Sequence, residues 1–204
     1  MSLVLAADYR VPDFDHWWAT LTGGLPRLPS LGAHHIVVYR SLEDASRIFV
    51  TIGVREREPI DALLRSPVMF SWFDSAGVQE IPPMFAGQVV EKLDLDPAAG
   101  TSVTTGAVIV AAIASIAQLD RLRASVHAAV ARLAASGVRR FWIYRALDDQ
   151  AEVMILQEIA TERQAEQWVR HPDAAAAFMA EAGAGAYPPL FVGRLVQAIE
   201  VPGN

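Results

Sequence analysis

The sequence contains no cysteine and a single lysine, Lys92. Without cysteine the chain forms no disulfide, offers no thiolate to a metal and has no cysteine nucleophile. The formal net charge is −6 at pH 7, and the arginines that carry most of the positive charge are scattered along the chain. Nucleic-acid binding needs a basic surface, so the composition argues against nucleic acid as a partner.

Long hydrophobic runs are also missing. The longest, "AVIVAAIASIA" from Ala107 to Ala117, is about half of the roughly 20 residues that span a membrane. The opening "MSLVLAADYR" has no basic segment before its short apolar run, as a signal peptide would have. With 52% hydrophobic residues the chain can nevertheless form a core. We therefore expect a soluble, cytoplasmic protein that does not associate with membranes.

Familiar catalytic signatures are absent as well. The sequence has no glycine-rich phosphate loop, no G-x-S-x-G motif and no acidic metal cluster. His16 and His127, on predicted helices, have no second histidine one helical turn away, so a histidine zinc site is unsupported. We expect neither a metal nor a cofactor.

What the sequence does contain is an internal repeat. The segment "VYRSLEDASRIFV", Val38 to Val50, returns from Ile143 as "IYRALDDQAEVMI", and matching residues such as Gly32 and Gly137 lie 105 positions apart. After one inserted residue, "AGVQEIPPMFAGQVV" is matched by "AGAGAYPPLFVGRLV". The intervening "DPAAGTSVTTG" is rich in linker residues. We predict a duplicated domain, with a first repeat at residues 1–96, a linker at 97–106 and a second repeat at 107–201.

Each repeat reads as β-α-β-β-α-β, the ferredoxin-like pattern of an antiparallel sheet with helices on one face. The strand "RIFVTIGV" is largely apolar in both parities, so that Ile48 and Val50 face one side while Phe49 and Thr51 face the other. A sheet with two apolar faces needs a cover on each. We therefore predict an α+β fold in which two tandem ferredoxin-like repeats present facing antiparallel sheets and form an intramolecular α/β barrel.

These features resemble the dimeric α/β-barrel superfamily, which includes the antibiotic-biosynthesis monooxygenases and the haem-degrading monooxygenases. The segments "FVTIGVREREPIDALLRSPVMFSWF" and "ILQEIATERQAEQWVRHPDAAAAF" carry the resemblance, because in each a strand leads into a short helix and a break before proline. Members of that superfamily form the barrel from two chains. The resemblance implies that this chain fuses both halves, as a monomeric pseudo-dimer or as a homodimer of fused chains.

The resemblance does not extend to the haem-degrading site. Those members use an asparagine on the first strand, a tryptophan on the helix after the third strand and a histidine ligand after the proline. Trp168 matches the tryptophan. The asparagine position holds Ala7 in one repeat and Ala112 in the other, and the ligand position falls near Ala177 or Phe178. Haem degradation by that mechanism is not expected.

Two residues of the second repeat are candidates for acid–base catalysis. Glu158 lies near the end of a strand, where it would serve as a base or would pair with an arginine at the strand end. His171 precedes a proline and titrates near neutral pH, and its alternative role is a loop histidine bonded to the backbone. His34 and His35, adjacent on a predicted strand, are expected to face opposite sides.

Aromatic side chains are the candidates for the walls of a substrate pocket. In related cofactor-free monooxygenases such side chains orient aromatic substrates, whereas in most proteins they belong to the core. Tyr9 ends the first strand and aligns with Ser115 of the second repeat. The candidates are Tyr9, Trp72, Trp142 and Trp168.

Two functions stay open. One is a cofactor-independent, monooxygenase-like enzyme that acts on a hydrophobic or aromatic small molecule; the other is a non-catalytic ligand-binding or scaffold protein of the same fold. The sequence does not decide whether the chain is an enzyme. A working site is expected mainly in the second repeat, which has an uninterrupted first helix together with Trp168, His171 and Glu158. The first repeat has Leu63, Ser66 and Gly53 at these positions.

Overall fold

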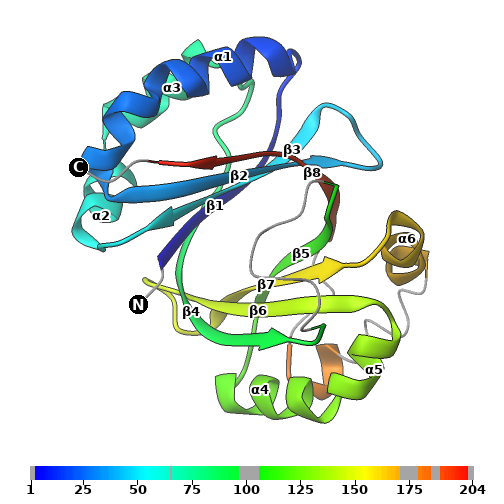
Figure 1. Cartoon of the computed structure of the whole chain (residues 1–204). Coiled ribbons are helices and arrows are strands. Elements are labelled where there is room, and N and C mark those ends of the chain that lie inside the picture. The colour runs from blue at the N-terminus through cyan, green and yellow to red at the C-terminus, as the bar shows by residue number, and fades with distance from the viewer. Residues whose placement is uncertain (1–2, 65, 97–105, 171–178, 185–188, 202–204) are drawn as a thin grey trace. The chain divides into compact units, whose positions relative to one another are not determined.

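The computed structural model describes residues 3–64, 66–96, 106–170, 179–184 and 189–201. Contacts along the chain divide it into two compact units (Figure 1): Met1–Ala86 with Leu195–Asn204, and Gly87–Arg194. The repeats predicted from the sequence, residues 1–96 and 107–201, are defined by duplication and not by contacts, and their limits stay a prediction. In the described part of the chain, no helix is both long and apolar enough to cross a membrane.

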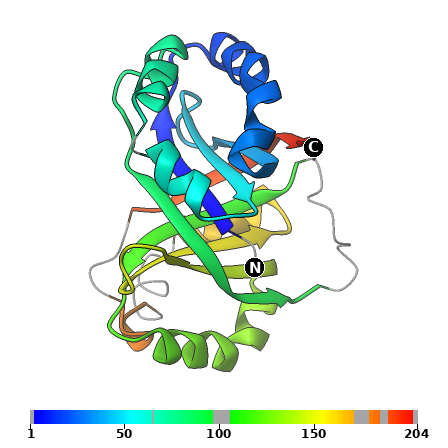
Figure 2. The same cartoon turned by 90° about the vertical axis from the view of Figure 1, so that its left-hand side faces the viewer.

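The first unit contains a sheet with helices on one of its faces. Figures 1 and 2 both show α1 and α3 on the same side of its strands. Its elements are β1 (Leu3–Arg10), α1 (Phe14–Gly24), the 3₁₀ helix η1 (Leu25–Leu31), β2 (Ala33–Ser41), β3 (Arg47–Val54), α2 (Glu58–Leu64), α3 (Pro67–Ser75), the start of β4 (Met84–Asp94) and the end of β8 (Phe191–Glu200).

The second unit repeats this order of elements. It holds the rest of β4 and the start of β8, and its other elements are β5 (Val108–Ser115), α4 (Leu119–Ala128), α5 (Val130–Ala135), β6 (Val138–Ala146), β7 (Glu152–Ile159) and α6 (Glu162–Arg170). The first helix of this repeat, predicted as uninterrupted, is in fact divided into α4 and α5 at Ala129, whose φ and ψ are −95° and 0°. In the first unit the corresponding helix is α1, and it ends earlier because Gly24 and two prolines favour the tighter η1.

All described strand pairs are antiparallel. In the first unit β3 pairs with β1 and with β2, and in the second unit β7 pairs with β5 and with β6. The second unit also pairs β6 with β4 and β5 with β8. Strands β4 and β8 each contribute to both units, and the order of the strands is β1-β3-β2-β8-β5-β7-β6-β4. The predicted α+β fold of two ferredoxin-like repeats is confirmed.

The repeat is visible in individual backbone hydrogen bonds. The amide of Arg55 donates to the carbonyl of Gly32, and the amide of Ala160 donates to the carbonyl of Gly137, 105 residues further along in each case. Both glycines have positive φ, 71° and 87°, which side-chain-bearing residues rarely adopt. The same turn therefore ends the helix and starts the second strand in each unit.

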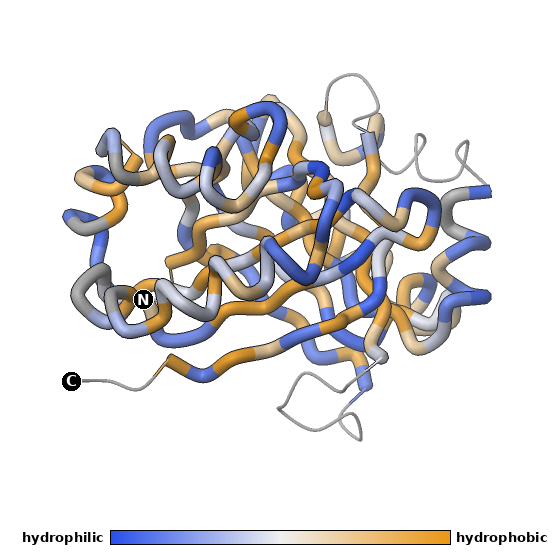
Figure 3. The backbone as a smooth tube through the Cα atoms, turned by 90° about the horizontal axis from the view of Figure 1, so that it is seen from above, coloured by the Kyte–Doolittle hydropathy of each residue, from blue (hydrophilic) through white to orange (hydrophobic). Residues whose placement is uncertain are grey.

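Both faces of β3 are buried, as the sequence predicts. Ile48 and Val50 pack with Trp17 and Leu21 of α1 in the core between the sheet and the helices. Phe49, on the opposite face, is 2% exposed. Figure 3, in which the tube is coloured by hydropathy, shows several long hydrophobic (orange) stretches of the chain.

The two adjacent histidines do not face opposite sides, so this prediction is wrong. The pairing of β2 with β3 shifts register between Ala33 and His35, and this bulge turns the side chains toward each other. The Nδ1 atoms of His34 and His35 lie 2.8 Å apart, and the ring centroids are 4.4 Å apart. A register shift occurs at the equivalent place in the second unit, between Val138 and Arg140.

Candidate ligand-binding cavity

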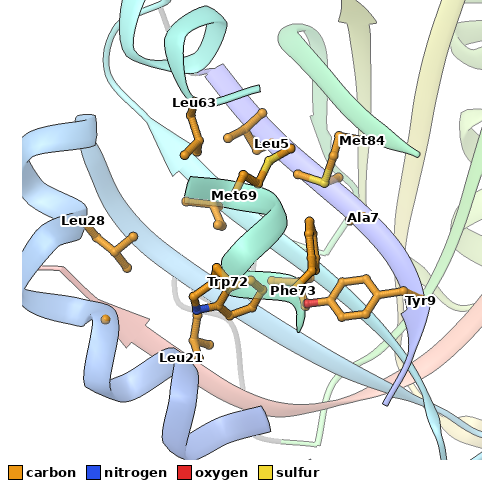
Figure 4. A pocket seen from close by; sticks show the side chains of 14 residues that line it. Leu5, Ala7, Tyr9, Leu21, Leu28, Leu63, Met69, Trp72, Phe73 and Met84 are labelled. Atoms are coloured by element: carbon orange, nitrogen blue, oxygen red, sulfur yellow. The ribbon is translucent and has the colours of Figure 1, made fainter. Parts of the chain in front are cut away.

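A cavity of about 190 Å³ lies in the first unit between the sheet and the helices (Figure 4). We call it the Tyr9 cavity. The described residues that line it lie between Leu5 and Met84, and all of them belong to the first unit. Its principal side chains are Leu5, Tyr9, Leu63, Met69, Trp72 and Phe73.

The local sequence explains why this space exists. Along β1 every second side chain points toward the helices, which places Leu5, Ala7 and Tyr9 at the cavity. Ala7 is small, so the sheet leaves room at this point. On α3, Met69 and Phe73 are four residues apart and therefore lie on one face of the helix, over the sheet.

Tyr9 accepts a hydrogen bond from Trp17, which is not among the residues that line the cavity. The indole Nε1 of Trp17, which is completely buried, donates to the Tyr9 hydroxyl oxygen over 3.1 Å. The Tyr9 ring also meets Phe73 edge-on, with centroids 5.7 Å apart and planes at 85°. Burial raises the pKa of Tyr9 well above its ordinary value, more than the hydrogen bond from Trp17 lowers it. The phenol therefore stays neutral at physiological pH.

The walls of the cavity are otherwise apolar. Of the described side chains that line it, Tyr9 alone is ionisable, and the Trp72 indole N–H is the other hydrogen-bond donor. The two thioether sulfurs, of Met69 and Met84, are weak acceptors. This arrangement can bind an apolar molecule and donate a hydrogen bond to it. It offers no acid or base that titrates near neutral pH.

Two of the four aromatic residues predicted as pocket walls line the cavity, and the other two lie in the second unit. Tyr9 and Trp72 both line the cavity, and Figure 4 shows their rings on either side of Phe73. Trp142 lies on β6 in the second unit, where the Arg140 guanidinium carbon is 5.6 Å from its ring centroid. Trp168 lies on α6, also in the second unit. Its side chain is outside the part of the chain that the structure describes.

The candidate base Glu158 is bound by an arginine. Its Oε2 lies 2.6 Å from Nη2 of Arg140, and both side chains are almost completely buried. This is the arginine pair that the sequence offered as the alternative role. The first unit has His35 and Gly53 at these two positions, and a Cβ on Gly53 would lie 2.1 Å from the His35 ring. A catalytic role for Glu158 stays a prediction, and His171 lies outside the described residues.

Sequence reasoning missed the residues that complete the cavity. Met69, Phe73 and Met84 line the cavity, and Trp17 donates a hydrogen bond to Tyr9. None of these four residues was a candidate, because the packing of the helices on the sheet brings them together. One signal was available. Strands β1 and β5 correspond residue for residue, so Tyr9 matches Ala114 rather than Ser115. Tyr9 and Trp17 have no aromatic counterpart in the second repeat, and this difference indicates a site beside them in the first repeat.

The expected location of the site also differs from where the cavity is found. We expected a working site mainly in the second repeat, whereas the Tyr9 cavity is built from the first. The segment of the second repeat that corresponds to α3 begins at Pro172, and its residues up to 178 lie outside the described residues. A site in the second repeat therefore stays a prediction.

Acid should destabilise the fold through the paired histidines. Burial lowers the pKa of His34, and the charge of Arg55 lowers it further; burial likewise lowers the pKa of His35, as does the charge of His34. Glu200 acts in the opposite direction on both. Folded pKa values below the ordinary 6.5 mean that the unfolded chain binds more protons, so stability is complete above about pH 6.5 and falls as the pH drops through the folded pKa values.

The measurement is the midpoint of thermal unfolding at pH 7.5 and at pH 5. We expect the midpoint to fall with acidification, and to fall less in the double variant His34→Gln/His35→Gln. An equal fall in the double variant would show that other groups cause the acid sensitivity.

Comparisons with known proteins identify the fold. No family model and no curated protein matches the sequence. Among solved structures, an anthrone oxidase-like protein matches with a TM-score of 0.69 at 12% identity, covering 98% of this chain and 93% of that one. A ferredoxin-fold protein related to antibiotic biosynthesis monooxygenases, from Listeria monocytogenes, matches with a TM-score of 0.55 at 8% identity, covering 97% and 96%.

A third match is a heme-degrading enzyme from Listeria monocytogenes, with a TM-score of 0.51 at 8% identity over 94% of this chain and 98% of that one. At such low identities the likeness concerns the fold. The resemblance inferred from the sequence is thereby confirmed: this chain has the ferredoxin-like fold of the antibiotic-biosynthesis-monooxygenase-like proteins.

Proposed function

We propose that the chain binds a hydrophobic or aromatic small molecule in the Tyr9 cavity. The observation that carries the proposal is an apolar space of about 190 Å³ with one neutral phenol in its wall. An apolar cavity of about 150 Å³ is large enough to hold benzene. The Tyr9 cavity therefore suits a compact ligand of one ring or two small fused rings.

Cofactor-independent oxygenation of that ligand is the second candidate function. Its support is the fold shared with an anthrone oxidase-like protein and with a protein related to antibiotic biosynthesis monooxygenases. Oxidation of an activated CH₂ group to a carbonyl balances without a cofactor: O₂ gives one atom to carbon, and the other leaves as water with the two hydrogens. In such a reaction Tyr9 would donate a hydrogen bond to the substrate oxygen as negative charge develops there.

The described lining favours binding over catalysis. Forming a carbanion from a CH₂ group requires a base, and Tyr9, whose pKa burial raises, does not act as one near neutral pH. A substrate for oxygenation would thus have to ionise readily on its own. We rank ligand binding first for this reason. A cytoplasmic location, and a monomeric pseudo-dimer or a homodimer as the assembly, stay predictions.

Thermal unfolding in the presence of a one-ring ligand tests the proposal. With acetophenone at ten times its dissociation constant, the stabilisation should be about 1.4 kcal/mol, a rise of about 3–6 °C in the midpoint for a chain of this size. No rise at any soluble concentration of one-ring and two-ring aromatics would contradict it. Oxygen uptake with 2-indanone, above the rate without protein, would establish the enzymatic candidate.

A further inference from the structure

We infer that the Tyr9 cavity selects a neutral aromatic ligand that carries a hydrogen-bond acceptor but no hydrogen-bond donor, such as an aromatic ketone or aldehyde. Trp17 is the positioning residue that sets this preference. The inference rests on the proposed function, since it names the ligand class of the same cavity. It goes beyond it by distinguishing ligands of equal size and shape.

The hydrogen bond between Trp17 and Tyr9 fixes which way the phenol acts. An indole N–H can only donate, so over this 3.1 Å contact the Tyr9 oxygen is the acceptor. The Tyr9 O–H must then turn elsewhere. In the described part of the chain it has no second hydrogen-bond partner, and Figure 4 shows the hydroxyl on the side of Phe73 and the cavity. A ligand acceptor in the cavity would receive this hydrogen bond.

The other side chains of the wall exclude the alternatives. A ligand hydroxyl would bring a donor, and apart from Tyr9 the only acceptors among the described side chains of the lining are the thioethers of Met69 and Met84, which are weak. A buried donor without a partner weakens binding. A carboxylate ligand would meet no cation among the described residues that line the cavity, which include no arginine, lysine or histidine, and an unpaired charge is costly to bury. A neutral carbonyl compound meets neither obstacle.

Packing alone does not require this polar pair. At the positions that correspond to Tyr9 and Trp17, the second unit has Ala114 and Leu122, which are 6% and 0% exposed. The same strand and helix are therefore buried there with apolar side chains only. The tyrosine and the tryptophan are a feature of the cavity in the first unit rather than a demand of the repeated fold.

The test uses three ligands with one carbon skeleton, acetophenone, 1-phenylethanol and ethylbenzene, with benzoate as the anionic counterpart. Dissociation constants are measured by calorimetry or ligand-observed NMR for the full chain and for Tyr9→Phe and Trp17→Phe. Tyr9→Phe should weaken acetophenone about tenfold and change ethylbenzene less than about twofold, because a single hydrogen bond is lost. Benzoate should bind the unaltered chain at least about a hundredfold more weakly than acetophenone.

Trp17→Phe distinguishes the effect of the Trp17 hydrogen bond from a general loss of packing. It frees the Tyr9 oxygen to accept, so the preference for acetophenone over 1-phenylethanol should fall at least about fivefold. If Trp17→Phe does not fold, the response of the ligand set to Tyr9→Phe decides alone. Equal weakening of all three neutral ligands by Tyr9→Phe would overturn the inference and leave the proposed function standing. Failure of every neutral ligand to bind the unaltered chain would overturn both.

Discussion

Replacing Glu158 with alanine should lower the free energy of unfolding by about 3–5 kcal/mol, the cost of removing one member of a buried ion pair. The Arg140 guanidinium, 4% exposed, would lose the carboxylate that lies 2.6 Å away. Its desolvation is then no longer compensated by that charge. Urea denaturation followed by circular dichroism measures the change. Ligand binding in the Tyr9 cavity should be unaffected, because Glu158 lies in the other unit.

Glu166→Ala is the matched control. This glutamate also pairs with an arginine, Arg170, at 3.0 Å, but both side chains are largely exposed. Removing such a pair should change stability by less than about 1 kcal/mol. A Glu158→Ala variant as stable as the control, yet unable to bind or turn over a ligand, would establish the catalytic role predicted from the sequence instead.

Trp17→Ala should be comparably damaging, with a loss of about 3–5 kcal/mol. The side chain is completely buried among aromatic neighbours, Phe14 and Tyr9, whose centroids lie 5.5 and 6.3 Å from its own. The substitution leaves a cavity beside the Tyr9 cavity and removes the donor to the Tyr9 hydroxyl. Denaturant unfolding measures the stability, and the affinity for acetophenone is measured on the folded fraction.

Leu122→Ala, at the corresponding and equally buried position of the second unit, separates packing from function. It should cost about 2–5 kcal/mol as a buried leucine without altering the ligand preference. If Leu122→Ala changed the preference as much as Trp17→Ala, the hydrogen bond to Tyr9 would not be its source.

The fold was predictable because the signals for its turns and strands occur in both repeats. Gly32 and Gly137 mark the same turn, and the continuous apolar strand around Ile48 and Phe49 showed that both faces of the sheet are buried. The bulge at His34 and His35 was not predictable, because consecutive residues of β2 are buried and a shift of the alternation by one residue leaves no mark in such a strand. The break of the helix at Ala129 likewise carries no proline or glycine to announce it.

The site was predictable only in part. Tyr9 and Trp72 were candidates as aromatics at strand and helix positions, and both line the cavity. The space itself depends on how far α3 stands from the sheet at Ala7, which no sequence pattern records. Glu158 looked like a base because its partner, Arg140, is a neighbour only after the strands pair.

A larger side chain on the sheet beneath the Tyr9 cavity should fill the cavity and so tests the proposed binding site. Ala7→Leu adds bulk where the sheet leaves room, and Ala112→Leu makes the same change 105 residues further on, in the second unit. We expect Ala7→Leu to abolish the rise in unfolding midpoint with acetophenone, and Ala112→Leu to keep the dissociation constant within about twofold. Loss of binding in Ala112→Leu, with Ala7→Leu unaffected, would contradict the proposed binding site and place the site in the second repeat.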